Sequence, residues 1–141
     1  MRLRVISVFI MLAVSLSLLS CIVTSRAIGV EISCDEFNED PNSIRNEFQA
    51  EIGDKITVKL CSNPTTGFQW KYEIIGNIVL KEEDYDFEEA EEEGLIGAAG
   101  REVWTFEAIE KGTTEVRMEY SRAWEGGEQA EWTYTMIVTV E

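Results

Sequence analysis

Strict alternation of apolar and polar residues recurs throughout the chain from Lys55 onward. Successive side chains of a β-strand point to opposite faces, so this period of two predicts strands with one buried and one solvated face. The predicted buried positions are Ile56, Val58, Leu60, Phe68, Trp70, Tyr72, Ile74, Trp104, Phe106, Ala108, Val116, Met118, Tyr120, Trp132, Tyr134, Met136, Val138 and Val140. Turn-forming residues separate the runs, and no helical period of comparable strength is present. We therefore expect an all-β fold, a single antiparallel β-sandwich.

Residues 1–20 have the features of a signal peptide. Two arginines precede an apolar run at residues 5–19, which serines interrupt and which is too short to span a membrane comfortably. The segment ends in Leu18-Leu19-Ser20-Cys21, which resembles the lipobox of lipoprotein precursors, whose cysteine carries the lipid. A signal-peptidase cut after Ala27 is the alternative and would release a soluble protein. Both routes place the mature protein outside the cytoplasm, secreted or lipid-anchored at the cell surface.

An N-terminal extension, residues 21–47, precedes the main strand pattern. We expect a first strand near its start and an irregular excursion over residues 35–45, where polar residues dominate. Disulfides are permitted outside the cytoplasm, and Cys34 and Cys61 are the remaining pair if Cys21 carries lipid. Two separate buried thiols are the alternative, because sequence alone does not fix the distance between them.

Acidic residues greatly outnumber basic ones. The chain has a formal net charge of −15, and removal of the two signal-peptide arginines leaves 10 of the 12 basic residues against 27 acidic ones, a net charge of −17. A surface this acidic repels nucleic acid and anionic lipid, so we expect no nucleic-acid partner and membrane contact only through a lipid on Cys21. The acidic run at residues 82–93 predicts a solvated strand edge or loop, with a calcium site as the alternative.

The chain contains no histidine. Serine and cysteine nucleophiles that rely on histidine for proton transfer are therefore excluded, as are the commonest zinc and copper sites. A pair of carboxylates could still support glycosidase-type chemistry, but the acidic residues lie mostly in one run or alternate with apolar residues along strands, where solvated acids are expected. We therefore expect a protein that is not an enzyme and has no cofactor and no metal.

Three connections between the predicted strands are unusual in composition. Alternate connections of a sandwich lie at the same end, which places residues 62–67, 94–100 and 121–129 together and the turns at residues 76–77 and 111–112 at the opposite end. We expect the three unusual loops to form one surface.

The first of these loops is built from stiff residues. Pro64 fixes its own φ, Gly67 can adopt a φ that other residues avoid, and the two intervening threonines are β-branched, with hydroxyls that can bond nearby backbone. Such a loop loses little entropy when it binds a partner. A plain tight hairpin turn is the alternative.

The second and third loops have different means of contacting a partner. In Gly97-Ala98-Ala99-Gly100, small side chains leave the backbone accessible to another chain, although a flexible connector would have the same composition. In the third loop, Arg122 and Trp124 belong to the residue types favoured as interface anchors. A tryptophan folded back onto its own core is the alternative.

These motifs resemble those of one inhibitor family. The stretch Asn63-Pro64-Thr65-Thr66-Gly67-Phe68 resembles the NPTTGF signature of chagasin, an inhibitor of papain-like cysteine proteases. The second loop is similar to the family's GxxG loop, and Arg122-Ala123-Trp124 is similar to its RPW loop, with Ala123 in place of the usual proline. The resemblance covers residues 48–141 in matching order and spacing, whereas the acidic run and the extension have no clear counterpart.

The resemblance implies an immunoglobulin-like β-sandwich domain at residues 48–141 that inhibits papain-like cysteine proteases reversibly, competitively and without a covalent bond. By this resemblance Thr65 and Thr66 would lie over the catalytic centre, the GxxG loop would run beside the substrate channel, and Arg122 with Trp124 would anchor the primed side. The expected protease-binding residues are Asn63, Pro64, Thr65, Thr66, Gly67, Phe68, Gly97, Ala98, Ala99, Gly100, Arg122, Ala123 and Trp124. The partner would be a papain-like cysteine protease and the inhibitor a monomer. A cell-surface adhesion or assembly module that binds a non-protease partner is the alternative function.

Overall fold

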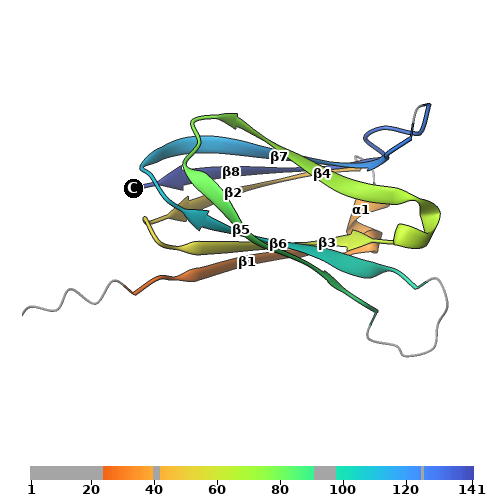
Figure 1. The fold of residues 1–141 in the computed structure, drawn as a ribbon, viewed down its shortest axis with the longest axis horizontal. Coiled ribbons are helices and arrows are strands. Elements are labelled where there is room, and N and C mark those ends of the chain that lie inside the picture. Colours follow the sequence, from red (N-terminus) through yellow and green to blue (C-terminus); the bar gives the residue numbers. More distant parts are fainter. Residues whose placement is uncertain (1–23, 40–41, 91–97, 125) are drawn as a thin grey trace, which may run out of the picture.

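The computed structural model describes residues 24–39, 42–90, 98–124 and 126–141, which form two four-stranded β-sheets packed face to face (Figure 1). One sheet has the order β1-β3-β6-β5, with bounds Ala27–Ile32, Lys55–Ser62, Gly100–Ala108 and Leu80–Glu88. The other has the order β2-β8-β7-β4, with bounds Ser43–Ala50, Trp132–Val140, Gly112–Arg122 and Phe68–Gly76. Two short helices complete the described fold, α1 at Cys34–Phe37 and the 3₁₀ turn η1 at Pro64–Thr66.

The core lies between the two sheets and is made of the residues that alternate along the strands. Ile56, Val58 and Leu60 of β3 are fully buried, as are Tyr134 and Met136 of β8. Their polar neighbours along each strand face outward, so the period of two places each apolar set on the inner face of its sheet. The prediction of an all-β sandwich is confirmed.

Two predictions about strand arrangement are wrong. Residues 35–45, interpreted as irregular, contain most of α1 and the start of β2. The sandwich is also not antiparallel throughout, because β1 pairs with β3 in parallel and β2 pairs with β8 in parallel. The physical reason is that the chain crosses from one sheet to the other between β1 and β2, so each of these strands is added to an edge without a hairpin turn.

The crossing segment between β1 and β2 is anchored in the core. Ser33 and Glu36 form a capping box at the start of α1, and the ring of Phe37 is fully buried, 5.1 Å from the Trp70 ring and 5.2 Å from the Trp132 ring between centroids. Cys34 and Cys61 form a disulfide, with 5.2 Å between their Cα atoms. The segment therefore closes the sandwich at the end where β3 leads into the first loop.

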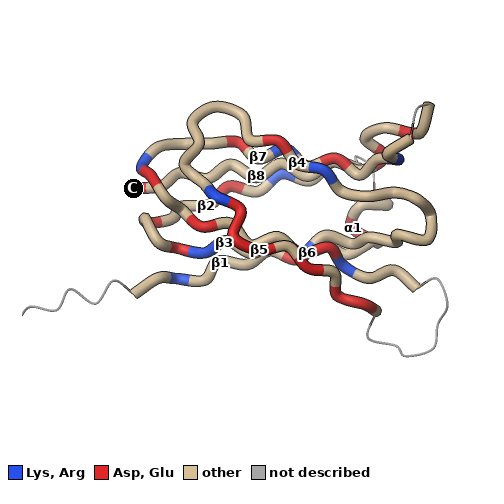
Figure 2. The backbone as a smooth tube through the Cα atoms, viewed as in Figure 1, with Lys and Arg blue, Asp and Glu red and all other residues tan. Residues whose placement is uncertain are grey.

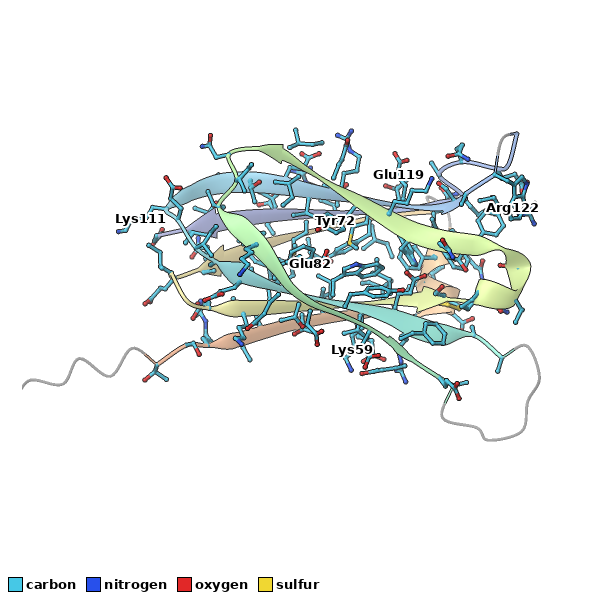
Figure 3. All side chains as sticks on the ribbon, viewed as in Figure 1. Lys59, Tyr72, Glu82, Lys111, Glu119 and Arg122 are labelled. Carbon is cyan, nitrogen blue, oxygen red and sulfur yellow. A yellow bond between two sulfur atoms is a disulfide. The ribbon has the colours of Figure 1, made fainter. Side chains whose placement is uncertain are left out.

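The strand registers define two ends of the molecule. At the loop end, Ser62 of β3 pairs with Gly100 of β6, and Phe68 of β4 pairs with Arg122 of β7. At the opposite, distal end, Gly76 pairs with Thr114. Figure 3 labels Arg122 at the loop end and Lys111 at the distal end. The roots of the three unusual loops therefore lie together, as the sequence predicts.

Strand β5 carries the first part of the acidic run along an edge of its sheet. Residues 81–86 are exposed, and Figure 2 shows acidic residues along β5. Lys55 and Lys59 of β3 neutralise part of this charge in ion pairs with Glu83 at 2.7 Å and Glu88 at 2.5 Å. The interpretation as a solvated strand edge is confirmed for residues 82–88, and residues 91–93 lie outside the described part.

The predicted signal peptide, residues 1–20, and the predicted lipid-bearing Cys21 lie outside the described residues. Within the described part of the chain, none of the helices has the length and apolar character that crossing a membrane requires.

Candidate functional site

The first loop is a closed turn held by its own side chains. Asn63 caps η1, and its Oδ1 accepts hydrogen bonds from the main-chain N–H of Thr65 at 3.2 Å and from the Thr65 hydroxyl at 2.6 Å. The Thr66 hydroxyl donates to the carbonyl of Asn63 at 2.6 Å. Both threonines and Pro64 are exposed to solvent. The loop therefore presents a short rigid tip whose backbone conformation is fixed before any partner arrives.

Gly67 ends this turn in a conformation that only glycine adopts easily. Its φ is +80°, and its N–H donates to the carbonyl of Pro64 at 3.0 Å. A Cβ atom at this position would overlap the ring of Trp124. The first and third loops are therefore in direct contact at Gly67.

The second loop is described only where it joins β6. Ala99 is exposed, Ala98 is partly exposed and Gly100 is buried. A Cβ atom at Gly100 would overlap the carbonyl oxygen of Glu88 and the ring of Phe87, so a glycine is required for β5 to approach β6 this closely. Gly97, the remaining residue of the predicted GxxG motif, lies outside the described residues.

The third loop folds over the first. The guanidinium carbon of Arg122 lies 4.5 Å from the centre of the Phe68 ring and 5.5 Å from that of the Trp124 ring. Its Nη1 donates to Glu128 at 2.9 Å, and its main-chain N–H donates to the carbonyl of Glu128 at 2.8 Å. The Trp124 side chain remains 53% exposed. Arg122 therefore links the two loops internally, while Trp124 is half available to a partner and does not enter the core.

A second set of contacts fixes the first loop to the strands behind it. The main-chain N–H of Asn63 donates to the hydroxyl of Tyr120 at 2.8 Å, and the Tyr120 ring stacks on Phe68 with centroids 5.1 Å apart. These contacts explain why Phe68, predicted as part of the binding motif, is almost completely buried. Its role is to support the loop from beneath.

Sequence reasoning missed the buried Glu102, which lies just behind the loops. It is 4% exposed and occupies the inward-facing register that continues through Trp104 and Phe106. Burial raises the pKa of this carboxyl group, and hydrogen bonds from Ser62, Trp70 and Tyr85 oppose the shift. The available signal was an acidic residue at an inward-facing position of an otherwise apolar alternation.

The exposed surface of these loops is suited to binding. None of the described loop-tip residues, Pro64, Thr65, Thr66, Ala98, Ala99, Ala123 and Trp124, has an ionisable side chain. The tips offer a rigid turn, accessible backbone and one aromatic ring. Such a surface recognises a partner by shape, backbone hydrogen bonds and apolar contact.

Comparison with known proteins identifies the family. Residues 49–138 match the model of the chagasin family of peptidase inhibitors, designated I42. This chain belongs to the chagasin family. Members of the family are inhibitors of cysteine proteases, and the chain is an inhibitor rather than an enzyme.

Related proteins and structures agree with this assignment. Amoebiasin-2 of Entamoeba histolytica is 28% identical over 89 residues, which is 62% of this chain and 72% of the relative. The crystal structure of the cysteine protease inhibitor EhICP2, also from Entamoeba histolytica, has a TM-score of 0.63 at 19% identity and covers 84% of this chain and 100% of its own. PbICP-C, solved in complex with falcipain-2, has a TM-score of 0.56 at 13% identity and covers 83% of this chain and 100% of its own. At these identities the two structures show that the chagasin-family member described here shares their fold.

Proposed function

We propose that this chagasin-family protein is a reversible, non-covalent, competitive inhibitor of papain-family cysteine proteases that inserts its three loops into the active-site cleft. The observation that carries the proposal is the contact of Trp124 with Gly67, which joins the first and third loops into one body beside the root of the second. The complex of PbICP-C with falcipain-2 shows a structural neighbour bound to another protein. One chain supplies all three loops, which supports the proposal of a monomeric inhibitor.

The first loop would block the catalytic centre without being cleaved. A protease attacks a peptide bond held in extended form and aligned with its nucleophile. Pro64, Thr65 and Thr66 instead form a 3₁₀ turn closed by hydrogen bonds from both threonine hydroxyls. The threonines therefore fill the centre of the cleft with a backbone that cannot adopt the reactive geometry.

The other two loops would extend the contact along the cleft. The backbone of residues 98–100 would pair edge to edge with the enzyme beside the substrate channel. The exposed part of the Trp124 ring would pack against apolar residues on the other side, with Arg122 holding the ring in place. Inhibitor interfaces of this kind bury about 800 Å² on each partner, an area that three adjacent loops can supply.

An inhibition assay tests the proposal directly. The purified mature chain should inhibit papain-like enzymes competitively, and Trp124→Ala or Thr66→Ala should each weaken binding by about 1 kcal/mol or more. Ile109→Ala, an exposed isoleucine at the distal end, is the matched control and should bind as the wild type does. Absence of inhibition across a panel of papain-like enzymes would contradict the proposed function, and unchanged affinity in both loop variants would contradict the site.

We also propose that the β-sandwich is of the immunoglobulin-like class. A further proposal is that the mature chain is a lipoprotein attached to the membrane through Cys21 outside the cytoplasm. The integration of Arg26 into the fold supports a cut ahead of it. Its main-chain N–H donates to the buried Asp54 at 2.7 Å, and its side chain donates to the same carboxylate at 3.2 Å. A cut after Ala27 would remove these bonds. Intact-mass measurement of the protein extracted from membranes should show a lipid on Cys21.

A further inference from the structure

We propose that Glu102 is a positioning residue of the inhibitor, whose buried carboxylate holds the roots of the first and second loops in a fixed relative position for entry into the protease cleft. This inference rests on the proposed function, because it concerns the geometry that inhibition requires. It adds a residue that lies outside all three loop motifs.

The position of Glu102 in the fold places it between the two loops. It lies on β6, two residues after Gly100, where the second loop ends. Its side chain faces the interior between the sheets and is 4% exposed. Glu102 is therefore inaccessible to a protease and can affect binding only through its neighbours.

The contacts of the carboxylate reach both sides of the first loop. Oε1 accepts a hydrogen bond from the hydroxyl of Ser62 at 2.6 Å and from the main-chain N–H of Trp70 at 3.3 Å. Ser62 is the last residue of β3 before the loop, and Trp70 is the third residue of β4 after it. Oε2 accepts a hydrogen bond from the hydroxyl of Tyr85 at 3.2 Å, on the strand that leads toward the second loop. One side chain thus connects four strands behind the two loops.

Burying a carboxylate at this position is unfavourable for the free energy of folding. No lysine or arginine among the described residues forms an ion pair with Glu102, so its charge is balanced only by hydrogen-bond donors. Desolvation disfavours a buried charge, yet an ionised carboxylate can accept all three donors at once and forms stronger bonds than a neutral group. A residue that costs stability but orders two loop roots is best explained by its effect on the loops.

Four variants of the full mature chain test this inference. Glu102→Leu removes both acceptor oxygens and with them all three hydrogen bonds. We expect the inhibition constant to rise about tenfold, mainly through faster dissociation, because loops that must be ordered on binding are held less tightly. Glu102→Gln retains one oxygen for Ser62 and Trp70, and it should inhibit within about threefold of the wild type. Ser62→Ala removes a single donor, and its inhibition constant should lie between those of these two variants.

Phe106→Leu is the matched control for a loss of packing. Phe106 lies on the same strand and the same inward face as Glu102 and is fully buried, but its side chain makes no hydrogen bond. This variant should lose stability and retain wild-type inhibition at temperatures where it is folded. Hydrogen exchange provides a second measurement. In Glu102→Leu, the amides of residues 62–70 should exchange faster than in the wild type, and those of the distal turn, residues 51–54, should exchange at the wild-type rate.

The outcomes separate the inference from the proposed function. Folded Glu102→Leu that inhibits as tightly as the wild type would overturn the positioning role, as would an equal loss of inhibition in Phe106→Leu. If Glu102→Leu does not fold, Ser62→Ala is the deciding variant. A wild-type inhibition constant together with wild-type amide exchange at residues 62–70 in Ser62→Ala would overturn the positioning role. If the wild type inhibits no papain-like enzyme, the proposed function fails, and unchanged exchange at residues 62–70 in Glu102→Leu would reject the positioning role independently.

Discussion

Gly67 satisfies two separate requirements at one position. Its φ of +80° lies in the left-handed region, and the ring of Trp124 occupies the space that a side chain would need. Gly67→Ala should therefore lose about 1–2 kcal/mol from backbone strain and also displace Trp124. Urea unfolding measures the first effect, and tryptophan fluorescence together with the inhibition constant measures the second.

Gly53→Ala is the control that separates these two effects. Gly53 has a φ of +93° at the distal end, and a Cβ atom there would meet no atom within 4 Å. This variant should show a similar loss of stability with unchanged fluorescence and inhibition. If Gly67→Ala inhibits as tightly as Gly53→Ala, the contact of Trp124 with Gly67 is not required for inhibition.

The stability of the protein should depend on pH through Glu102. Burial raises the pKa of this group in the folded chain, so the folded state binds more protons than the unfolded state between the unfolded pKa, about 4.3, and the raised folded value. The contribution of Glu102 to folding therefore becomes less favourable as pH rises through that window. Glu102→Gln should be more stable than the wild type at neutral pH, and the difference should shrink as the pH falls through that window. Urea unfolding of both proteins from pH 3.5 to 7.5 checks this, and a difference independent of pH would contradict it.

At the residue scale, the sequence predicts what depends on near neighbours. The stiffness of the first loop follows from Pro64, Gly67 and the threonine hydroxyls, which are all local properties. The contact between Trp124 and Gly67 is not predictable in this way, because the two residues lie far apart in the chain. The internal role of Arg122 escaped prediction for the same reason, since it depends on the placement of Phe68.

The disulfide between α1 and β3 ties the N-terminal segment to the root of the first loop. It closes a separation of 27 residues, for which the loss of unfolded-state entropy is worth roughly 3–4 kcal/mol. The double variant Cys34→Ala, Cys61→Ala should therefore lose about this much free energy of unfolding, and its urea midpoint should be lower than that of the wild type. Reductant should lower the free energy of unfolding of the wild type toward that of the variant, and it should leave the variant's free energy of unfolding unchanged. A variant as stable as the wild type would show that Phe37 alone anchors the segment.

At the element scale, most of the strands were predictable and their partners were not. The alternation in β3, β6, β7 and β8 identifies each strand and its inward face, because both are local consequences of the period of two. The parallel pairing of β2 with β8 depends on a crossing between sheets, which has no period. Strand β2 was missed although Ile44, Phe48 and Ala50 alternate with polar residues, since the inward Asn46 interrupts their apolar face.

The whole molecule combines a strongly acidic body with described loop-tip residues, 64–66, 98–99 and 123–124, that carry no ionisable side chain. Long-range attraction or repulsion between a charged protein and its partner changes the association rate and is screened by salt. With a formal net charge of −15 for the full sequence, or −17 without the two arginines of the predicted signal peptide, the inhibitor should associate more slowly with a basic papain-like protease as salt rises, and more rapidly with an acidic one. Stopped-flow association at low and high salt measures this, and the dissociation rate should change little. Rates independent of salt for both proteases would show that the body does not steer the encounter.

Both ends of the described chain lie at the distal end, opposite the loops (Figure 1). The carbonyl of Arg26 accepts a hydrogen bond from the N–H of Lys55, and the N–H of Glu141 donates to the carbonyl of Ala50. A tether joined to the first residues would therefore leave the molecule standing on its distal turns with its binding tips directed into the surrounding medium. In the lipoprotein that we propose, a protease approaching from outside would meet the blocking surface first.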